Sequence, residues 1–276
     1  MHLFNTSIFD IFLSLKRHRP LILQLIKREV IGRYRGSFLG LLWSFINPIL
    51  MLAIYTFVFS VVFKVRLDQT DSSIYNDKFA FALSLFAGLI IFNLLSECLS
   101  RAPGLILANV NYVKKIIFPL EILPWVTLGS ALFHAGISLL VLFGFLLVIN
   151  HPIPWTFIYL PIVVLPLLFL IMGLSWFIAS IGVFVRDIGQ LIGLILTMLM
   201  FMSPIFYPAS ALPESVRDYL FLNPLTFIIE QVRAVILYGQ APNWLGLTVY
   251  YLIALLIAWA GLIWFEKTRK GFADVL

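Results

Sequence analysis

Between Glu121 and Arg186 the chain reads ILPWVTLGSALFHAGISLLVLFGFLLVINHPIPWTFIYLPIVVLPLLFLIMGLSWFIASIGVFV, 64 residues without one Asp, Glu, Lys or Arg. A single helix of that length would measure roughly 96 Å, about three times the hydrocarbon thickness of a bilayer. The run is interrupted at Asn150-His151-Pro152-Ile153-Pro154, where two prolines remove the amide donors that a continuing helix needs. The stretch therefore predicts two membrane spans, 122–149 and 155–185, joined by a tight polar turn.

The rest of the chain is similarly apolar. Hydrophobic residues make up 62% of the 276 residues and charged residues only 12%, which is not the composition of a soluble domain. Further stretches with almost no charge can each hold a helix of about 20 residues. They predict spans at about 38–63, 79–99, 188–207 and 244–265. The predicted fold is therefore one all-α polytopic membrane domain, residues 1–276, with six transmembrane helices.

The basic residues predict the orientation of these spans. Of the 19 Lys and Arg residues, 14 fall in one set of segments and five in the other. The first set comprises 1–35, 100–121, the turn at Arg186 and 266–276. The second comprises 64–78, 150–154 and 208–243. Because short loops rich in Lys and Arg stay in the cytoplasm, both termini are expected to be cytoplasmic. The net charge of +6 then reflects orientation, and no folded basic surface for nucleic acid is expected.

Two segments outside the spans also have apolar patterns. Pro20–Arg35 carries Leu21, Ile22, Leu25 and Ile26 at helical spacing with cations after them, which predicts an amphipathic helix along the inner membrane interface. The segment 208–243 mixes apolar pieces with charges and contains an Asn223-Pro224 step. It predicts a periplasmic re-entrant helix pair, and an amphipathic pair on the outer surface is the alternative.

Several enzyme classes lack their signatures in this sequence. No His-Glu-x-x-His pattern is present, and Gly173-Leu174-Ser175 lacks the later glycine of a serine-nucleophile turn. Small residues in a membrane helix are more typical of close packing. The single cysteine, Cys98, excludes a disulfide framework. No catalytic, metal or cofactor site is predicted. Without a Gly-Lys dipeptide there is no phosphate-binding ATPase loop, so any ATPase must be another polypeptide.

Glu97 is the only acidic residue inside a predicted span. A helix starting near Phe79 would place it roughly 27 Å along, at the cytoplasmic rim, with Arg101 four residues later. An ion pair between Glu97 and Arg101 is predicted there rather than a proton relay. A secondary transporter or channel working without an ATPase remains the alternative function.

Four motifs, taken in order, closely resemble the polysaccharide-export permeases of ABC transporters. They are RYRGSFLGLLWSFINP (33–48, running on to Ile54-Tyr55), NYVKKIIFP (111–119), Arg186-Asp187 followed by a span ending in MSPIFYP (202–208), and NPLTF (223–227). The resemblance covers nearly the whole length and is greatest to O-antigen exporters, with capsule and teichoic-acid exporters close behind.

The resemblance implies partners and a substrate. The expected assembly is a homodimer of permeases with two copies of a nucleotide-binding ATPase subunit, which would bind ATP and Mg²⁺ itself. The expected substrate is a lipid-linked polysaccharide, moved across the bacterial inner membrane among membrane lipids.

The resemblance also implies a docking segment for the ATPase, between Arg101 and Phe118. Polar residues are mixed there with apolar ones, as a helix-in-groove contact requires. The candidate docking residues are Asn109, Asn111, Tyr112, Lys114 and Lys115. The alternative is an ordinary positively charged loop. Pro103-Gly104 predicts a helix break before the docking helix.

By the same resemblance the first and fifth spans line the channel. Aromatic residues make up 16% of the chain, and aromatic rings stack on the apolar faces of sugars. The candidate lining residues are Phe38, Phe45, Tyr55, Phe59, Phe201 and Tyr207. Phe-rich membrane helices are common, so contact with lipid is the alternative role for each ring.

Overall fold

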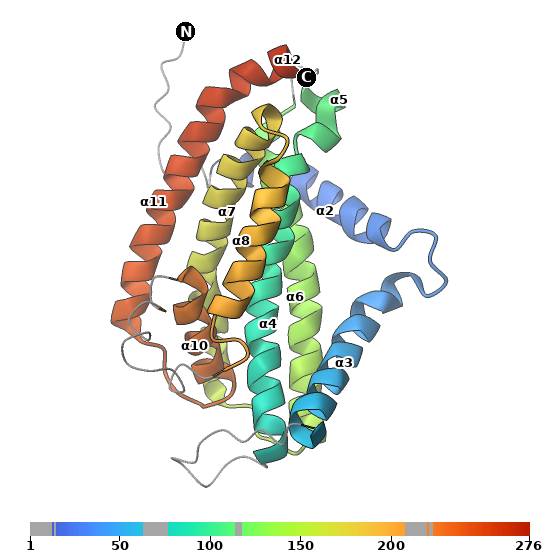
Figure 1. Cartoon of the computed structure of the whole chain (residues 1–276), viewed down its shortest axis with the longest axis vertical. Helices are drawn as coiled ribbons and strands as arrows, with labels where there is room; N and C mark the ends of the chain where they lie inside the picture. Colours follow the sequence, from blue (N-terminus) through green and yellow to red (C-terminus); the bar gives the residue numbers. More distant parts are fainter. Residues whose placement is uncertain (1–12, 14, 63–76, 114–117, 208–219, 221–222) are drawn as a thin grey trace.

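The computed structural model describes residues 13, 15–62, 77–113, 118–207, 220 and 223–276. Every regular element in these ranges is helical, and the long helices form one bundle (Figure 1). Five helical segments are long and apolar enough to cross a membrane: Gly40–Phe59, Phe79–Gly104, Leu120–Val148, Trp155–Phe184 and Trp244–Val275. The all-α membrane fold is therefore confirmed.

The described residues form eight longer helices and nine short ones. The longer helices are α2 (Arg19–Arg33), α3 (Trp43–Thr56), α4 (Asp77–Arg101), α6 (Leu123–Val148), α7 (Leu160–Phe184), α8 (Ile188–Met202), α10 (Pro224–Ile236) and α11 (Trp244–Thr268). The short ones are η1 (Gly40–Leu42), η2 (Phe57–Val62), η3 (Ala102–Gly104), η4 (Leu107–Asn109), α5 (Val110–Val113), η5 (Leu120–Ile122), η6 (Trp155–Tyr159), η8 (Arg269–Gly271) and α12 (Phe272–Val275). The end that holds α5 and α12 is called the α12 end, and the opposite end the α10 end (Figure 1).

Helix α4 is the centre of the bundle. It packs against α3, α6, α7, α8 and α10. Within its most apolar stretch 83% of the residues are buried, against 11% for the span Gly40–Phe59 that contains α3. A helix that is apolar on every side is expected to be surrounded by others, as α4 is. Because so little of the α3 span is buried, most of the surface of α3 is left uncovered by the rest of the described chain.

Helices α7 and α11 pack most closely, through glycine. A Cβ added to Gly173 would stand 2.5 Å from the carbonyl oxygen of Ile257, and one added to Gly261 would overlap the carbonyl of Gly173. Only glycine lets the two backbones approach this far. The structure thus assigns Gly173 to helix packing.

The interruption at Asn150–Pro154 is where the sequence predicts it. Helix α6 ends at Val148, Asn150 takes a left-handed conformation with φ 54°, and the chain reverses into η6 and α7. The predicted span at 188–207 is shorter than expected: α8 has 15 residues, about 22 Å of helix. The described residues thus contain five full spans, and the predicted count of six is not confirmed, because α8 as described is too short.

Two other predictions are met only in part. Helix α10 begins at the predicted Asn223-Pro224 step, where the Asn223 side chain caps the amide of Leu225. Its predicted companion falls almost wholly on 208–219 and 221–222, outside the described residues. The re-entrant pair therefore stays a prediction.

Helix α2 differs from the expected interfacial helix in what covers its apolar face. Ile22 and Leu25 are buried against Ile122 and Val126 at the start of α6, while Leu23 on α2 is exposed. Ile26 sits over Gly129, where a Cβ would overlap it. The apolar face that the sequence assigns to lipid thus packs in large part on protein.

Candidate functional site: a polar cavity between α3, α4 and α6

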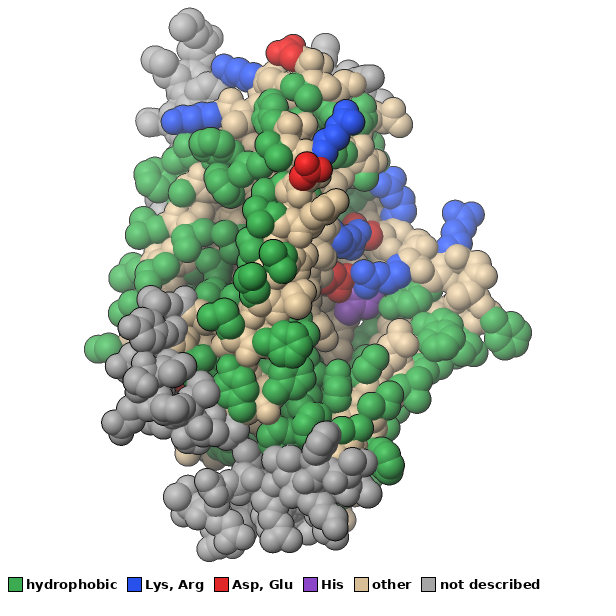
Figure 2. Space-filling view, viewed as in Figure 1, with side chains coloured by type: hydrophobic (Ala, Val, Ile, Leu, Met, Phe, Trp, Pro, Cys, Tyr) green, Lys and Arg blue, Asp and Glu red, His purple; other side chains and the backbone are tan. Residues whose placement is uncertain are grey.

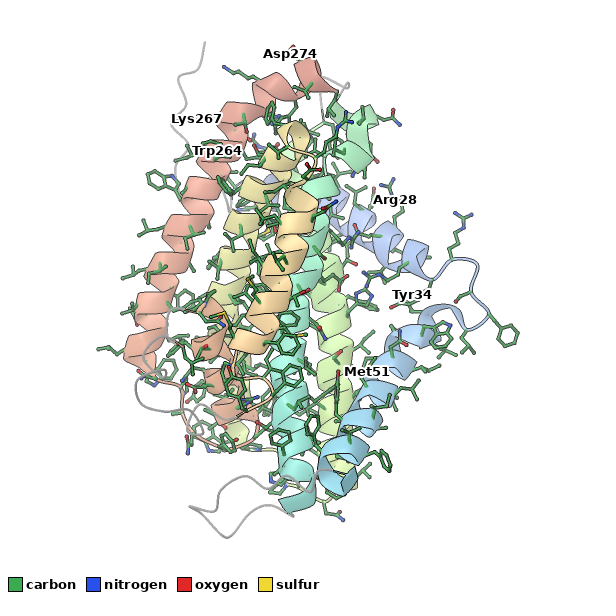
Figure 3. The ribbon with its side chains drawn as sticks, in the orientation of Figure 1. Arg28, Tyr34, Met51, Trp264, Lys267 and Asp274 are labelled. Atoms are coloured by element: carbon green, nitrogen blue, oxygen red, sulfur yellow. The ribbon has the colours of Figure 1, made fainter. Side chains whose placement is uncertain are left out.

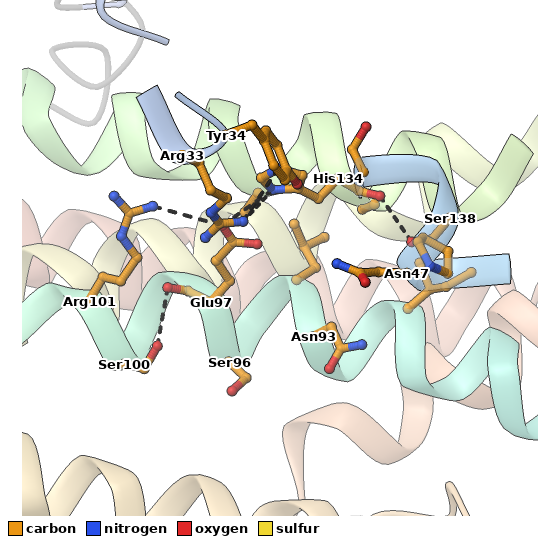
Figure 4. A pocket seen from close by; sticks show the side chains of 16 residues that line it. Arg33, Tyr34, Asn47, Asn93, Ser96, Glu97, Ser100, Arg101, His134 and Ser138 are labelled. Carbon is orange, nitrogen blue, oxygen red and sulfur yellow. Dashed lines mark hydrogen bonds and ion pairs between the residues drawn. The ribbon is translucent and has the colours of Figure 1, made fainter. Parts of the chain in front are cut away.

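Figure 4 shows the residues that line a cavity of about 480 Å³, which lies along the second half of α4, the half nearest the α12 end. One wall comes from the end of α2 and from α3. The other walls come from the second half of α4 and the first half of α6. Its lining is Arg33, Tyr34, Ser44, Asn47, Pro48, Ile90, Asn93, Leu94, Ser96, Glu97, Ser100, Arg101, Ala131, His134, Ala135 and Ser138.

The cavity exists because the chain leaves the bundle between α2 and α3. Gly36 and Gly40 adopt positive φ values of 88° and 51° in this connection, which side chains other than glycine rarely tolerate. The connection projects away from α4 and α6, and α3 returns at a slant (Figure 1). Figure 3 shows Tyr34 where this connection leaves α2. The 33–48 motif thus forms an entire wall of the cavity.

A charge network lines the α12 side of the cavity. The Glu97 carboxylate accepts from Nη2 of Arg33 at 2.6 Å and lies 3.4 Å from Nδ1 of His134. Nη1 of Arg33 stands 2.9 Å from the same His134 nitrogen. Nη1 of Arg101 contacts Glu29 at 2.5 Å and Glu97 at 3.8 Å. One carboxylate of α4 thereby links α2 and α6.

The sequence pairs Glu97 with Arg101, and the structure brings these two within 3.8 Å. Each nevertheless has a closer partner, because Arg33 and Glu29 approach from α2. Sequence reasoning misses Arg33, Glu29 and His134, since only the packing of α2 across α4 and α6 brings them together. The lone histidine of an apolar helix was the available signal for His134.

Deeper in the cavity are polar side chains without partners. Among the described residues no hydrogen bond involves the side chains of Asn47, Asn93 or Ser96. Both asparagines are exposed to the cavity or its opening. Asn93 precedes Arg101 by eight residues, about 12 Å along α4 toward the middle of the bundle. Amides at membrane depth need water or a ligand to satisfy them.

The predicted docking segment lies at the α12 end (Figure 1), and its first residue, Arg101, also lines the cavity. Helix α4 stops at Arg101, as Pro103-Gly104 predicts, and short helical turns follow through η4 and α5. Asn111 is exposed, whereas the Asn109 side chain donates to the carbonyl of Leu105 in its own turn. Lys114 and Lys115 lie outside the described residues.

Tyr112 connects this segment to two other parts of the chain. Its ring stacks on Phe118 with centroids 4.1 Å apart, and its hydroxyl accepts from Arg28 of α2 at 3.2 Å. Arg269 beyond α11 donates to the carbonyl of Phe118 and pairs with Glu121 at 2.9 Å. Tyr112 therefore has structural partners within its own chain.

The six rings predicted to line a channel are not equivalent. Phe38 is fully exposed in the α2–α3 connection, two residues before the first helical span begins at Gly40, and its role as a lining ring stays a prediction. Phe45 is 39% and Phe201 61% exposed. Tyr55 and Phe59 pack on the core, the latter with its ring 5.0 Å from that of Phe81. The Tyr207 hydroxyl donates to the carbonyl of Phe201.

A second arginine site lies at the α10 end. Arg233 of α10 is 6% exposed, and its guanidinium donates to the carbonyls of Ser84, Pro204 and Ile205 at 2.9, 2.7 and 3.1 Å. The Asn223 amide donates to the Ser203 hydroxyl just after α8. Helix α10 thus holds the end of α8 against α4.

Comparisons with known proteins match this chain over most of its length. The O-antigen export system permease protein RfbA of Myxococcus xanthus is 28% identical over 263 residues, 95% of this chain and 97% of its own. The RfbA protein of Klebsiella pneumoniae is 24% identical over 93% of this chain and 95% of its own. The capsule polysaccharide export inner-membrane protein CtrC of Neisseria meningitidis serogroup B is 29% identical, covering 84% and 83%. Residues 20–237, from the first turn of α2 to the end of α10, match the model of the ABC-2 type transporter family, and the chain belongs to that family.

Proposed function

We propose that this chain is the channel-forming permease subunit of an ABC exporter that moves a lipid-linked polysaccharide of the O-antigen type across the inner membrane. ATP hydrolysis on a separate subunit powers the transport. The observation that carries the proposal is the end-to-end similarity to O-antigen permeases. The apolar helical bundle is compatible with it.

Two permease copies suit this function better than one. One chain uses its helices to surround α4 and leaves no room for a polymer at its centre. Helices α3 and α8 expose large apolar side chains, among them Ile49, Leu50, Leu191 and Leu194. A second copy could cover such faces, and the two bundles together could enclose a sugar chain.

The ATPase subunits, also two copies, are proposed to dock at the α12 end. Asn111 is exposed there, and the segment is tied to α2 and α11 through Tyr112 and Phe118. A movement of this segment would therefore be transmitted to α2 and to the end of α11. The double variant Lys114→Glu and Lys115→Glu should weaken assembly or uncouple hydrolysis, because reversed charges repel a complementary surface. Full coupling in that variant would place the docking site elsewhere.

Both termini are proposed to be cytoplasmic. In a Cys98→Ala background, a cysteine at exposed Gln240 should react with an impermeant thiol reagent applied from the periplasm. A cysteine at exposed Asn111 should react only after the inner membrane is permeabilised. The reverse pattern would invert the proposed orientation.

Export itself is tested in cells that lack this chain. They should accumulate lipid-linked polysaccharide on the cytoplasmic side, and re-expression should restore surface polymer. Rescue should require a partner ATPase that can hydrolyse ATP. Rescue with a hydrolysis-dead ATPase, driven instead by an ion gradient, would favour a secondary transporter or channel.

A further inference from the structure

We propose that the cavity between α3, α4 and α6 binds the head group of a lipid amphiphile, a sugar attached through phosphate to a hydrocarbon chain. The inference rests on the proposed function and adds to it a place of substrate recognition. It begins from the unpartnered amides of Asn47 and Asn93, which line the same cavity from α3 and α4 (Figure 4).

The inner part of the cavity suits carbohydrate hydroxyls. An asparagine amide offers two donors and an acceptor, and a hydroxyl offers one donor and an acceptor. Asn47, Asn93 and Ser96 therefore present both kinds of group without any competing partner among the described residues. None of the three carries charge, which favours a neutral, hydroxyl-rich ligand at that depth.

The mouth of the cavity suits one phosphate group. Arg33 and Arg101 line the mouth, and their side chains remain 40% and 36% exposed although Glu97 and Glu29 pair with them. Arg101 uses only Nη1 for its two ion pairs, so its Nη2 and Nε remain available to an acceptor in the described structure. Guanidinium groups bind phosphate through paired donors of this kind.

The exposed side of α3 suits a hydrocarbon chain. Ile49, Leu50 and Ile54 follow the lining residues Asn47 and Pro48 along this helix, and each is about half exposed. Figure 2 shows charged side chains and a histidine gathered beside the start of this hydrophobic surface. A ligand with its sugar in the cavity, its phosphate at the mouth and its hydrocarbon chain along α3 would meet complementary groups in all three places. A free sugar phosphate would make no contact with the apolar side chains of α3.

Binding is tested on the purified complex of permease and ATPase, without nucleotide. The probe is glucose linked through phosphate to farnesol, and its affinity is measured by native mass spectrometry. Comparison ligands are farnesyl phosphate, which lacks the sugar, octyl glucoside, which lacks the phosphate, and phosphatidylglycerol. The expected order places the complete probe first.

Asn47→Leu and Asn93→Leu keep the side-chain size and remove the amide. Each should weaken binding of the glucose probe about tenfold, from the loss of one or two hydrogen bonds, and leave farnesyl phosphate within about twofold. Thr248→Val on α11 is the matched control, because its hydroxyl donates only to its own helix at Trp244. It should change neither affinity.

Three results would overturn the proposal. The first is that the probe shows no saturable binding. The second is that both asparagine variants bind the probe as well as the unmodified protein does. Either result would mean that the cavity holds only water. Equal affinity for phosphatidylglycerol would make it a general lipid site. Because binding is measured without turnover, any of these outcomes can coexist with normal export in cells, and a failure of export would instead reject the proposed function.

Discussion

Arginine is held in two different ways in the two halves of this bundle. Arg33 and Arg101, at the cavity, are 40% and 36% exposed and pair with carboxylates on other helices. Arg233, at the α10 end, is buried, and within the described part of the chain its guanidinium donates to backbone carbonyls only. The first arrangement joins side chains that can change partners, whereas the second fixes one backbone against two others.

The packing is also closer around Arg233 than around Arg33 and Arg101. Gly88 of α4 leaves the space beside Arg233, since a Cβ there would stand 3.1 Å from its Nη2. By contrast, the α2–α3 wall contains a cavity and two glycines with positive φ. We infer that α4, α8, α10 and the α7–α11 pair form a fixed frame, and that α2 and α3 form a wall able to shift against it.

The largest effect is expected for Arg233→Met. The change removes three charge-assisted hydrogen bonds and leaves buried carbonyls without donors, so the free energy of unfolding should fall by about 3–5 kcal/mol. Thermal unfolding of the purified complex, followed by size exclusion, measures it. Arg35→Met is the matched control, because Arg35 is exposed and should tolerate the same change. Equal melting temperatures of the two variants would show that Arg233 stabilises the bundle no more than the exposed Arg35 does.

A somewhat smaller loss is expected for Gly261→Ala. The added methyl group would overlap the backbone of Gly173, which cannot move aside as a flexible side chain could. Overpacking of this kind costs about 2–3 kcal/mol. Gly136→Ala on α6 serves as the control, since nothing lies within 4 Å of its Cβ position. If both variants melt alike, α7 and α11 are not packed as closely as described.

A still smaller change in stability is expected for Glu97→Gln. The arginine partners of Glu97 are partly exposed, and such ion pairs contribute little, so the free energy of unfolding should fall by about 1 kcal/mol. The wall should nevertheless loosen, because Arg33 and His134 lose the carboxylate that joins α2 and α6 to α4. A cysteine at Asn47 should then react faster with a water-soluble thiol reagent in a Cys98→Ala background. An unchanged reaction rate would show that the network does not hold the wall.

The sequence predicts the fixed frame better than the wall. Uncharged runs give α4, the η6–α7 segment and α11 within a few residues, and the proline pair gives the turn before η6. Such features are local, because the bilayer imposes a length and a polarity on each helix. Helix α8 is the exception: its apolar run continues to residue 213, but the helix ends at Met202, where Ser203–Ile205 turn toward α10.

The cavity depends on contacts that no local pattern contains. Arg33 and Glu97 are 64 residues apart, and His134 is a further 37 along the chain. The sequence does identify Glu97 as unusual, and the 33–48 motif as a unit. It cannot show that the motif folds into a wall facing Glu97, since that follows from the slant of α3 and the crossing of α2 over α6. Arg233 illustrates the same limit, because its backbone partners have no sequence signature.

The smallest change in stability is expected for Phe201→Ala. This variant tests whether an exposed aromatic ring lines the channel, in contrast to a ring that packs in the core. Phe201 is 61% exposed near the end of α8 and touches Phe206 with centroids 6.0 Å apart, so its removal should cost less than about 1 kcal/mol. Phe59→Ala is the counterpart: that ring packs on Phe81 and the core, and its loss should cost about 3 kcal/mol. A ring that stacks on a passing sugar chain should matter for export without mattering for folding.

Phe201→Ala is therefore expected to lower the rate of polysaccharide export severalfold while assembly and melting temperature stay near those of the unmodified complex. Phe59→Ala should lower export only in proportion to the loss of folded complex. The measurement is surface polymer per assembled complex, which corrects for expression. Unchanged export per complex in Phe201→Ala would mean that this exposed face of α8 meets lipid, and that the channel is lined by other residues.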